Sequence, residues 1–315
     1  MKKVFIDGSA GTTGLRIRER LAARTDLEVL VLAEDVRKDP AARRDALNAA
    51  DVAFLCLPDA AAVEAVQMVE NPQTVVIDTS TAHRTAAGWT YGFPELDGQR
   101  ARIRRATRVA NPGCHASGFI ALVAPLVRAG VLPSDARLAA FSLTGYSGGG
   151  KKMIAAYEAE ACAGPLAGGR QYALGQFHKH LPEMAKVCGL DHAPCFSPIV
   201  VPHYSGMEVT VPLFASQLRG VAAGDALAAL REIYRAAYAE EGLVRFVEDP
   251  SADEGGFLSS AALSGRDDME VSIFGNAERL LLVARFDNLG KGASGAAIQN
   301  MNLVLGCAEG EGLVF

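Results

Sequence analysis

The chain has 315 residues, of which 50% are hydrophobic and 21% are charged, and its net charge at pH 7 is -5. This length allows two domains with a large core. The acidic balance, without a long basic run, argues against nucleic acid and against an anionic membrane surface as partners. Residues 109–127 lack charged side chains, but they open on a polar turn and contain Pro125, so their apolar part is too short to span a bilayer.

The N-terminus and the cysteines indicate a reduced, cytoplasmic protein. Only three apolar residues separate Lys3 from Asp7, so no secretion signal is expected. The cysteines form no CxxC pair and no spacing typical of a metal site, and all but one are expected to be structural: Cys56, Cys114, Cys162, Cys188, Cys195 and Cys307.

The first part of the chain alternates short apolar strands with helices. Strands are expected over residues 3–7, 27–33, 52–57 and 74–78, with helices at 40–49 and 60–69 and another after the first strand. This alternation is typical of an α/β fold with a doubly wound parallel sheet. Five arginines between Arg100 and Arg108 accompany a strand-like stretch and indicate a solvated loop or edge.

Beyond about residue 115, strand-like runs follow one another with fewer helices between them. The expected strands predict a second, α+β domain with a mixed or antiparallel sheet: 137–143, 199–204, 207–214, 270–274 and 279–286. A final helical stretch, 293–305, is expected to pack back on the first domain. We therefore predict two domains, a doubly wound (Rossmann) domain of residues 1–114 with 293–315 and an α+β domain of residues 115–292.

A glycine-rich segment joins the first strand to the first helix. Its spacing, Gly8-x-x-Gly11-x-x-Gly14, is a variant of the dinucleotide fingerprint, and backbone N–H groups at the helix start would hold the pyrophosphate. A tight turn needing three glycines is the alternative. The residues expected to bind the cofactor here are Gly8, Ser9, Ala10, Gly11, Thr12, Thr13 and Gly14.

The end of the second strand leaves the choice between NAD and NADP open. Glu34 or Asp35 would accept a ribose hydroxyl of NAD, whereas Arg37 or Lys38 would pair with the 2′-phosphate of NADP.

Cys114 is the candidate nucleophile. The turn Asn111-Pro112-Gly113 precedes it, and the apolar run 119–127 predicts a buried helix, so Cys114 falls in the first turn of that helix. Free N–H groups and the helix dipole stabilise a thiolate there, and the thiolate is the reactive form. A small buried hydrophobe is the alternative for any lone cysteine.

Two histidines one residue apart, His178 and His180, are the candidates for proton transfer. A histidine paired with a cysteine nucleophile moves the protons of the reaction, and Glu183 would orient it. The His-x-His pattern also suggests a metal, but no further ligands with suitable spacing accompany it, so we expect none.

Two further segments carry candidate binding groups. Ser147-Gly148-Gly149-Gly150-Lys151 lies between a strand and a helix, where Lys151 would face a phosphate or carboxylate, although a hinge is the alternative. Ser80 and Arg84 follow the fourth strand, at the edge where parallel sheets bind ligands, and are expected to face cofactor or substrate.

Taken together, these motifs resemble those of the short-type N-acetyl-γ-glutamyl-phosphate reductases, within the wider aspartate-semialdehyde dehydrogenase-like group. The likeness covers essentially the whole chain. Besides the segments above, it is carried by Tyr91-Gly-Phe-Pro-Glu-Leu96 and by Asp287-Asn-Leu-Gly-Lys-Gly-Ala-Ser-Gly295.

The resemblance implies an NADP-dependent enzyme of arginine biosynthesis that interconverts an acyl phosphate and its semialdehyde. It implies that Cys114 is the nucleophile and His178 the acid/base group. Substrate and phosphate would be the small-molecule partners, and a homo-oligomer, dimer or tetramer, is expected. The other residues it implicates are His180, Tyr172 and Glu183 for the substrate and Ser147, Gly148 and Asn288 for the cofactor. His115 stands where the family pattern leads us to expect an aromatic such as Tyr.

Three alternatives remain at this point. A sibling reductase would act on a carrier-protein-linked aminoadipyl or glutamyl phosphate, and a non-catalytic NADP sensor would keep only the fold. A thiol hydrolase would need no redox cofactor, which the glycine segment disfavours.

Overall fold

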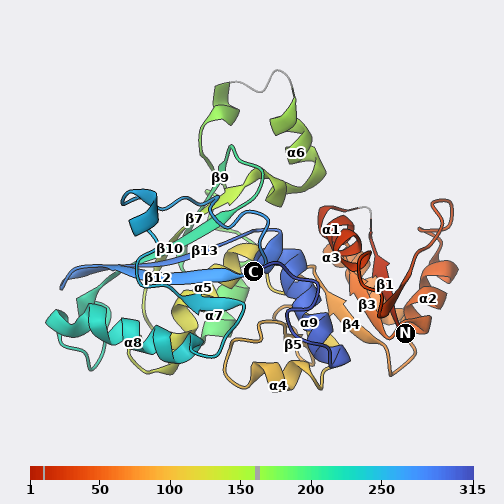
Figure 1. Ribbon diagram of the computed structural model, residues 1–315, viewed down its shortest axis with the longest axis horizontal. Coiled ribbons are helices and arrows are strands. Elements are labelled where there is room, and N and C mark those ends of the chain that lie inside the picture. Colours follow the sequence, from red (N-terminus) through yellow and green to blue (C-terminus); the bar gives the residue numbers. More distant parts are fainter. Residues whose placement is uncertain (10, 160–163) are drawn as a thin grey trace. The chain divides into compact units, whose positions relative to one another are not determined.

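The computed structural model describes residues 1–9, 11–159 and 164–315, so Ala10 and Cys162 lie outside the described residues. The chain divides into two compact units, which are considered separately (Figure 1). Unit 1 comprises Met1–Gly113 and Ala293–Val314, and unit 2 comprises Cys114–Gly292 with Phe315. In the described part of the chain, no helix is both long and apolar enough to cross a membrane.

Unit 1 is a six-stranded sheet in the order β2-β1-β3-β4-β6-β5, and every neighbouring pair is parallel. The predicted doubly wound parallel sheet is therefore confirmed. Its strands are β1 (Lys2–Asp7), β2 (Leu27–Leu30), β3 (Val52–Leu55), β4 (Val75–Asp78), β5 (Thr90–Tyr91) and β6 (Arg108–Ala110).

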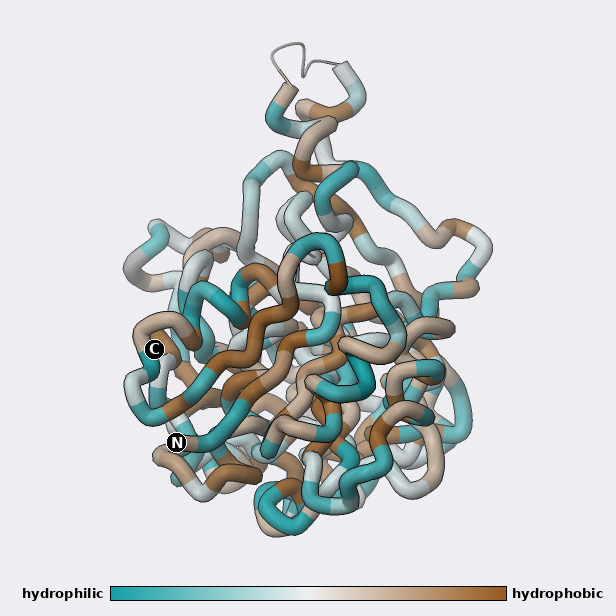
Figure 2. The backbone as a smooth tube through the Cα atoms, turned by 90° about the vertical axis from the view of Figure 1, so that its right-hand side faces the viewer, coloured by the Kyte–Doolittle hydropathy of each residue, from teal (hydrophilic) through white to brown (hydrophobic). Residues whose placement is uncertain are grey.

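Helices cover both faces of this sheet. On one face, apolar side chains of α1, α4 and α9 pack against strand residues such as Val4, Phe54 and Ile77. On the other, α2 and α3 pack against Phe5, Ala53 and other residues of the same strands. In Figure 2 the strands stand out as brown apolar segments among teal and white loops. The helices are α1 (Thr12–Leu21), α2 (Pro40–Ala49), α3 (Asp59–Gln67), α4 (Gln99–Ile103) and α9 (Gly295–Leu305).

Unit 2 is built on a seven-stranded mixed sheet in the order β11-β12-β13-β10-β7-β9-β8. Parallel pairs (β7 with β9, β11 with β12) occur beside antiparallel ones, so the predicted mixed sheet is confirmed. The strands are β7 (Ala139–Gly145), β8 (Arg170–Gln171), β9 (Cys195–Val201), β10 (Met207–Phe214), β11 (Val244–Phe246), β12 (Met269–Gly275) and β13 (Arg279–Phe286).

One face of the second sheet carries the core of unit 2. Helix α5 (Cys114–Arg128) packs on β10 and β13, and α8 (Ala226–Tyr238) packs on β11 and β12 (Figure 1). The fit is close, because a methyl group on Gly118 would come within 2.6 Å of Val209 Cγ2. Helix α7 (Leu181–Cys188) contacts α5, and α6 (Gly150–Glu158) follows β7 along the chain.

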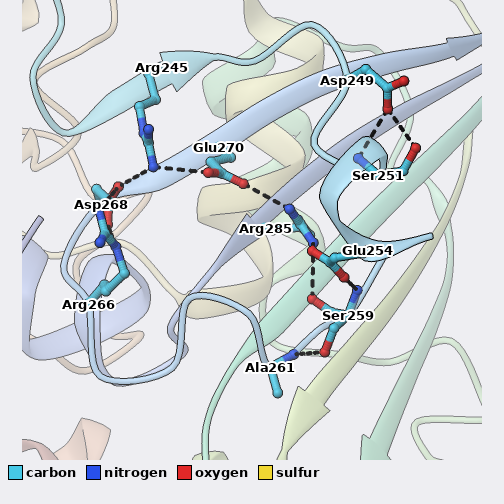
Figure 3. Close-up of polar contacts among 10 residues, drawn as sticks. All are labelled: Arg245, Asp249, Ser251, Glu254, Ser259, Ala261, Arg266, Asp268, Glu270 and Arg285. Atoms are coloured by element: carbon cyan, nitrogen blue, oxygen red, sulfur yellow. Dashed lines mark hydrogen bonds and ion pairs between the residues drawn. The ribbon is translucent and has the colours of Figure 1, made fainter. Parts of the chain in front are cut away.

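The opposite face, which we call the outer face, carries a row of charges in register. Glu208, Arg285, Glu270 and Arg245 are neighbours on successive strands β10, β13, β12 and β11. Figure 3 shows Glu270 between Arg245 and Arg285, with contacts of 2.9 and 3.0 Å, while Glu254 caps Arg285. Arg285 is 4% exposed, so these carboxylates neutralise a buried cation.

Several local expectations were wrong, including the bounds of strands and one missed helix. Strand β2 ends at Leu30 instead of residue 33, so residues 31–33 belong to the loop. The arginine-rich stretch contains helix α4 before the short strand β6. Strand β9 begins at Cys195, four residues before the expected start.

The charge row predicts that Glu208→Gln stabilises the protein at pH 8. Burial, the largest influence, raises the pKa of Glu208 above its ordinary 4.5, against the opposing effects of Thr210 and Arg285. Because the folded-state pKa is the higher one, the wild type loses stability as the pH rises above about 4.5, and the loss is complete above the folded pKa. The variant's denaturant midpoint should therefore exceed the wild type's at pH 8, and the two should converge below about pH 4.

Glu270→Gln is the matched control, since it removes a carboxylate that accepts hydrogen bonds from Arg245 and Arg285 and should lower the midpoint. If Glu208→Gln is the less stable protein at pH 8, the attraction of Arg285 outweighs the cost of burial.

Candidate active site

The glycine segment of unit 1 has two sterically required glycines and one that leaves open space. Gly8 has φ +86°, and a Cβ there would lie 2.3 Å from the Cys56 carbonyl oxygen. A Cβ on Gly14 would lie 2.6 Å from the Gly8 carbonyl oxygen. Gly11, directly before α1, has no neighbour closer than 3.5 Å, so its absent side chain leaves room beside the free N–H groups of the helix.

A cavity of about 230 Å³ opens next to this segment, entirely within unit 1. Gly8 and Ser9 line it together with Arg37 and Lys38, the residues that the sequence had singled out. Sequence reasoning missed two more cations in its wall, Arg18 on α1 and Arg43 on α2.

The charges of this cavity sum to a positive value. Asp7 is the only acid among the described lining residues, and Arg43 holds its buried carboxylate with contacts of 2.9 to 3.3 Å. Glu34 lies outside the lining and pairs with Arg37 at 2.6 Å. Exposed pairs of that kind contribute little, so an incoming phosphate can replace Glu34 on Arg37. The positive charge of this cavity suits a phosphate-bearing dinucleotide.

The residues after β4 form a closely bonded turn. The buried Asp78 carboxylate accepts hydrogen bonds from the Ser80 hydroxyl (2.8 Å) and lies 2.6 Å from His83 Nδ1. Arg84 donates to the backbone oxygens of Thr79 and Asn111, both at 3.0 Å. Ser80 therefore helps to hold the loop after β4, and Arg84 ties that loop to the turn before Cys114.

The turn before Cys114 is held within unit 1 by two contacts of the Asn111 side chain. The Asn111 amide donates to the Ala293 carbonyl oxygen at 3.0 Å and its own side-chain oxygen lies 3.2 Å from Asn300 Nδ2. The segments where the chain leaves unit 1 and returns to it are thus tied together.

Helix α5 begins at Cys114, which is partly exposed. A Cβ on Gly292 would lie 3.0 Å from Cys114 Cβ, so any side chain at this position would crowd the cysteine. Asp287, fully buried, shapes the segment that brings Gly292 there: its carboxylate accepts from the backbone N–H of Leu289 at 2.7 Å and from the Ser205 hydroxyl at 3.0 Å, and its backbone oxygen accepts from Gly292 N–H at 3.0 Å.

Two of the other cysteines, Cys56 and Cys188, are unreactive because they are buried. Burial raises the pKa of Cys56 to about 12 and raises that of Cys188 as well. Neither of these two thiols forms a thiolate at neutral pH.

Aromatic and imidazole rings gather around His115, the second residue of α5. Its ring lies 5.3 Å from that of His178, 5.6 Å from that of His180 and 5.3 Å from that of Phe196. Tyr172 reaches the same cluster, with its hydroxyl 2.7 Å from His115 Nε2. The structure thus brings three predicted residues, His178, His180 and Tyr172, to the first turn of α5. Glu183, also predicted, is buried in the first turn of α7.

Other predicted residues of unit 2 lie in a separate hydrogen-bonded group. Asn288 donates to the Ser147 hydroxyl at 3.0 Å and accepts from Gly206 N–H at 3.0 Å, and both Asn288 and Ser147 are buried. A Cβ on Gly148 would lie 3.4 Å from Asn288 Nδ2. Lys151 is exposed in the first turn of α6, at the end of this group.

Comparison with known proteins identifies the class. A family model for the semialdehyde dehydrogenase NAD binding domain matches residues 3–106, and one for the semialdehyde dehydrogenase dimerisation domain matches residues 114–288. An aspartate semialdehyde dehydrogenase II structure from Vibrio cholerae shares the fold, with a TM-score of 0.71 over 97% of this chain and 98% of that one at 17% identity. The chain has the architecture of a semialdehyde dehydrogenase.

Closer relatives narrow the class. An N-acetyl-gamma-glutamyl-phosphate reductase of Burkholderia ambifaria is 47% identical, covering 97% of both chains. N-acetyl-gamma-glutamyl-phosphate reductase 2 of Pseudomonas putida is 45% identical, covering 98% of both. The chain belongs to the semialdehyde dehydrogenase family and, within it, to the N-acetyl-gamma-glutamyl-phosphate reductases, which confirms the resemblance seen in the motifs.

Proposed function

We propose that the protein reduces N-acetyl-γ-glutamyl phosphate to N-acetylglutamate semialdehyde and phosphate with NADPH, in arginine biosynthesis. The names of its relatives support the reaction. The observation that carries it is the position of Cys114 as the first residue of α5, beside a cluster that contains His178, His180 and Tyr172. Unit 1 takes the cofactor and unit 2 the substrate.

The chain's own groups account for the chemistry. The Cys114 thiolate attacks the acyl carbon, the bond from that carbon to the phosphate oxygen breaks, and phosphate leaves with the electron pair, giving a thioacyl enzyme. Bound NADPH supplies the hydride that reduces the thioacyl carbon. The resulting oxyanion of the thiohemiacetal collapses to the aldehyde and returns the thiolate.

Two features of the site would stabilise the charges that develop during this reaction. The start of α5 presents backbone N–H groups and the positive end of the helix dipole to the thiolate and to the oxyanion, contacts worth roughly 3–4 kcal/mol per donor. His178 donates a proton to the tetrahedral oxygen or withdraws it, with His180 and Glu183 lining the substrate side.

The cofactor is NADP rather than NAD in this proposal. The cationic cavity beside the glycine segment, with Arg37 and Lys38 in its wall, supports a site for the 2′-phosphate. Gly8 to Gly14 would hold the pyrophosphate, and Ser147, Gly148 and Asn288 would lie toward the nicotinamide. A thiol nucleophile that must stay reduced supports a cytoplasmic location.

Cys114→Ser should lose more than nine-tenths of kcat while keeping its affinity for NADP, because the residue bears the nucleophile and lies outside unit 1. The assay is NADP reduction with N-acetylglutamate semialdehyde in the presence of phosphate or arsenate. Cys195→Ser, an exposed cysteine of β9, is the control and should retain its rate. Rapid turnover of the wild type in buffer free of both anions would instead define a hydrolytic aldehyde dehydrogenase.

Arg37→Gln with Lys38→Gln should raise the Kd for NADP roughly tenfold or more and leave that for NAD nearly unchanged, because each cation contributes a charge-assisted hydrogen bond to the 2′-phosphate. Titration of both cofactors against intrinsic fluorescence measures this. Arg44→Gln on α2 removes a charge outside the cavity lining and serves as the control. An equal loss for both cofactors would remove these residues from the 2′-phosphate site.

The protein also forms a homodimer through the outer face in this proposal. Phe141, Phe214 and Leu281 point outward from β7, β10 and β13 and are 48%, 60% and 45% exposed. The family model that covers this unit describes a dimerisation domain. Apolar side chains of three adjacent strands, continuous with the charge row, offer a second copy of the chain a flat surface to cover.

Phe141→Lys with Leu281→Lys should convert the dimer to a monomer in analytical ultracentrifugation, since burying two new charges at the interface is costly. Val63→Lys, on α3 of unit 1 and similarly exposed, should leave the dimer intact. A dimer that survives the outer-face substitutions would place the interface elsewhere.

A further inference from the structure

His115 joins two side chains that lie far from each other in the sequence. Its Nδ1 is 2.7 Å from the Ser142 hydroxyl on β7, and its Nε2 is 2.7 Å from the Tyr172 hydroxyl. His115 is 3% exposed and Ser142 is completely buried, whereas Tyr172 is partly exposed. The three groups form a chain that begins in the core and ends at the cluster beside Cys114.

The imidazole at the centre of this chain is uncharged at neutral pH. Burial, and then the charges of His178 and Lys179, lower the pKa of His115 to about 3. A neutral imidazole has one N–H donor and one acceptor nitrogen, so each of its two hydrogen bonds runs in a fixed direction.

Ser142 decides that direction. Among the residues that the structure describes, His115 is the only hydrogen-bond partner of the Ser142 hydroxyl. A buried hydroxyl that fails to donate its proton costs roughly 1–3 kcal/mol. Ser142 therefore donates to Nδ1, which places the imidazole proton on Nε2, and Nε2–H donates to the Tyr172 oxygen. The phenolic proton is then directed away from His115.

Tyr172 is suited to use that proton. Burial first, and then the nearby Cys114, raise the pKa of Tyr172, so the phenol stays protonated at neutral pH and lies within the electrostatic reach of the thiol. Its ring is 5.7 Å from that of His178. An O–H that is directed away from His115 is available to an oxygen of a group bound at Cys114.

We propose that His115 is a positioning residue: with Ser142 behind it, it commits Tyr172 to donate a hydrogen bond to a substrate oxygen beside Cys114. The proposal deepens the reductase function proposed above and rests on it for the identity of the substrate. It gives the departure at position 115 a role, because an imidazole has two ring nitrogens and links Ser142 to Tyr172, whereas a tyrosine at this position would have a single hydroxyl.

Two measurements test the proposal. The first is the ¹⁵N NMR spectrum of the histidine rings in the resting protein at pH 7, assigned by comparison with His115→Phe combined with Ser142→Ala. We expect the Nε2–H tautomer for His115. The Nδ1–H tautomer, or a charged ring, would overturn the proposal whether or not the enzyme is active.

The second measurement is a double-mutant cycle on kcat/KM for N-acetylglutamate semialdehyde. Tyr172→Phe should lower kcat/KM about 10- to 100-fold, as expected for a hydrogen bond to a charged oxygen, and the pair His115→Phe with Ser142→Ala should lower it by a similar factor. Adding Tyr172→Phe to that pair should then lower kcat/KM by less than a further factor of about three, because the Tyr172 hydroxyl has already lost its fixed direction.

A merely structural role for His115 gives a different pattern, in which the two losses multiply to the full product, and that outcome overturns the proposal. Ser142→Ala is included in the pair so that no buried hydroxyl is left without its acceptor, and the denaturant midpoint checks that the variants fold. Failure of the proposed function is seen separately, as the absence of phosphate-dependent turnover in the wild type, and leaves the tautomer measurement intact.

Discussion

The buried carboxylate of Asp287 is the interaction on which the candidate site depends. It gathers backbone N–H groups of residues 289 and 290 and the hydroxyl of Ser205, and its own backbone fixes Gly292. That segment passes so close to Cys114 that a side chain at position 292 would crowd the cysteine. A fully buried carboxylate is tolerated because several donors compensate the loss of water. The thiol is thus held by backbone geometry rather than by side-chain packing that could repack.

Much of the fold could be predicted because its determinants are local. Apolar runs bounded by turn residues predicted the strands 207–214 and 279–286 and the helix 40–49 with the ends that the structure shows. The failures occur where a distant partner decides. Helix α4 follows Gly98 in a left-handed conformation, and Arg100 on it pairs with Glu309 near the other end of the chain. No window of local sequence contains that contact, so the arginines were interpreted as a solvated loop or edge.

The candidate site shows the same division. Cys114 and the histidine pair were found because a turn before a helix and a His-x-His pattern are visible in short segments. The partners of His115 lie 27 and 57 residues away, and hydrogen bonds over such separations leave no periodic trace. Arg18 and Arg43 were missed for a related reason, since two helices bring them to the cavity that the loop residues Arg37 and Lys38 also line.

The two units use different physical means of recognition. Unit 1 gathers cations in one cavity although the chain as a whole carries a net charge of -5, so local charge would attract a phosphate that the net charge would repel. The cluster of unit 2 relies on groups that burial keeps neutral, the imidazole of His115 and the phenol of Tyr172. Neutral donors keep their orientation without attracting a counter-ion, so in the proposed reaction the thiolate of Cys114 would be the charge that reacts. Separating charge-based binding in one unit from positioning by neutral groups in the other would therefore let one chain hold a polyanionic cofactor and keep a reactive sulfur at Cys114.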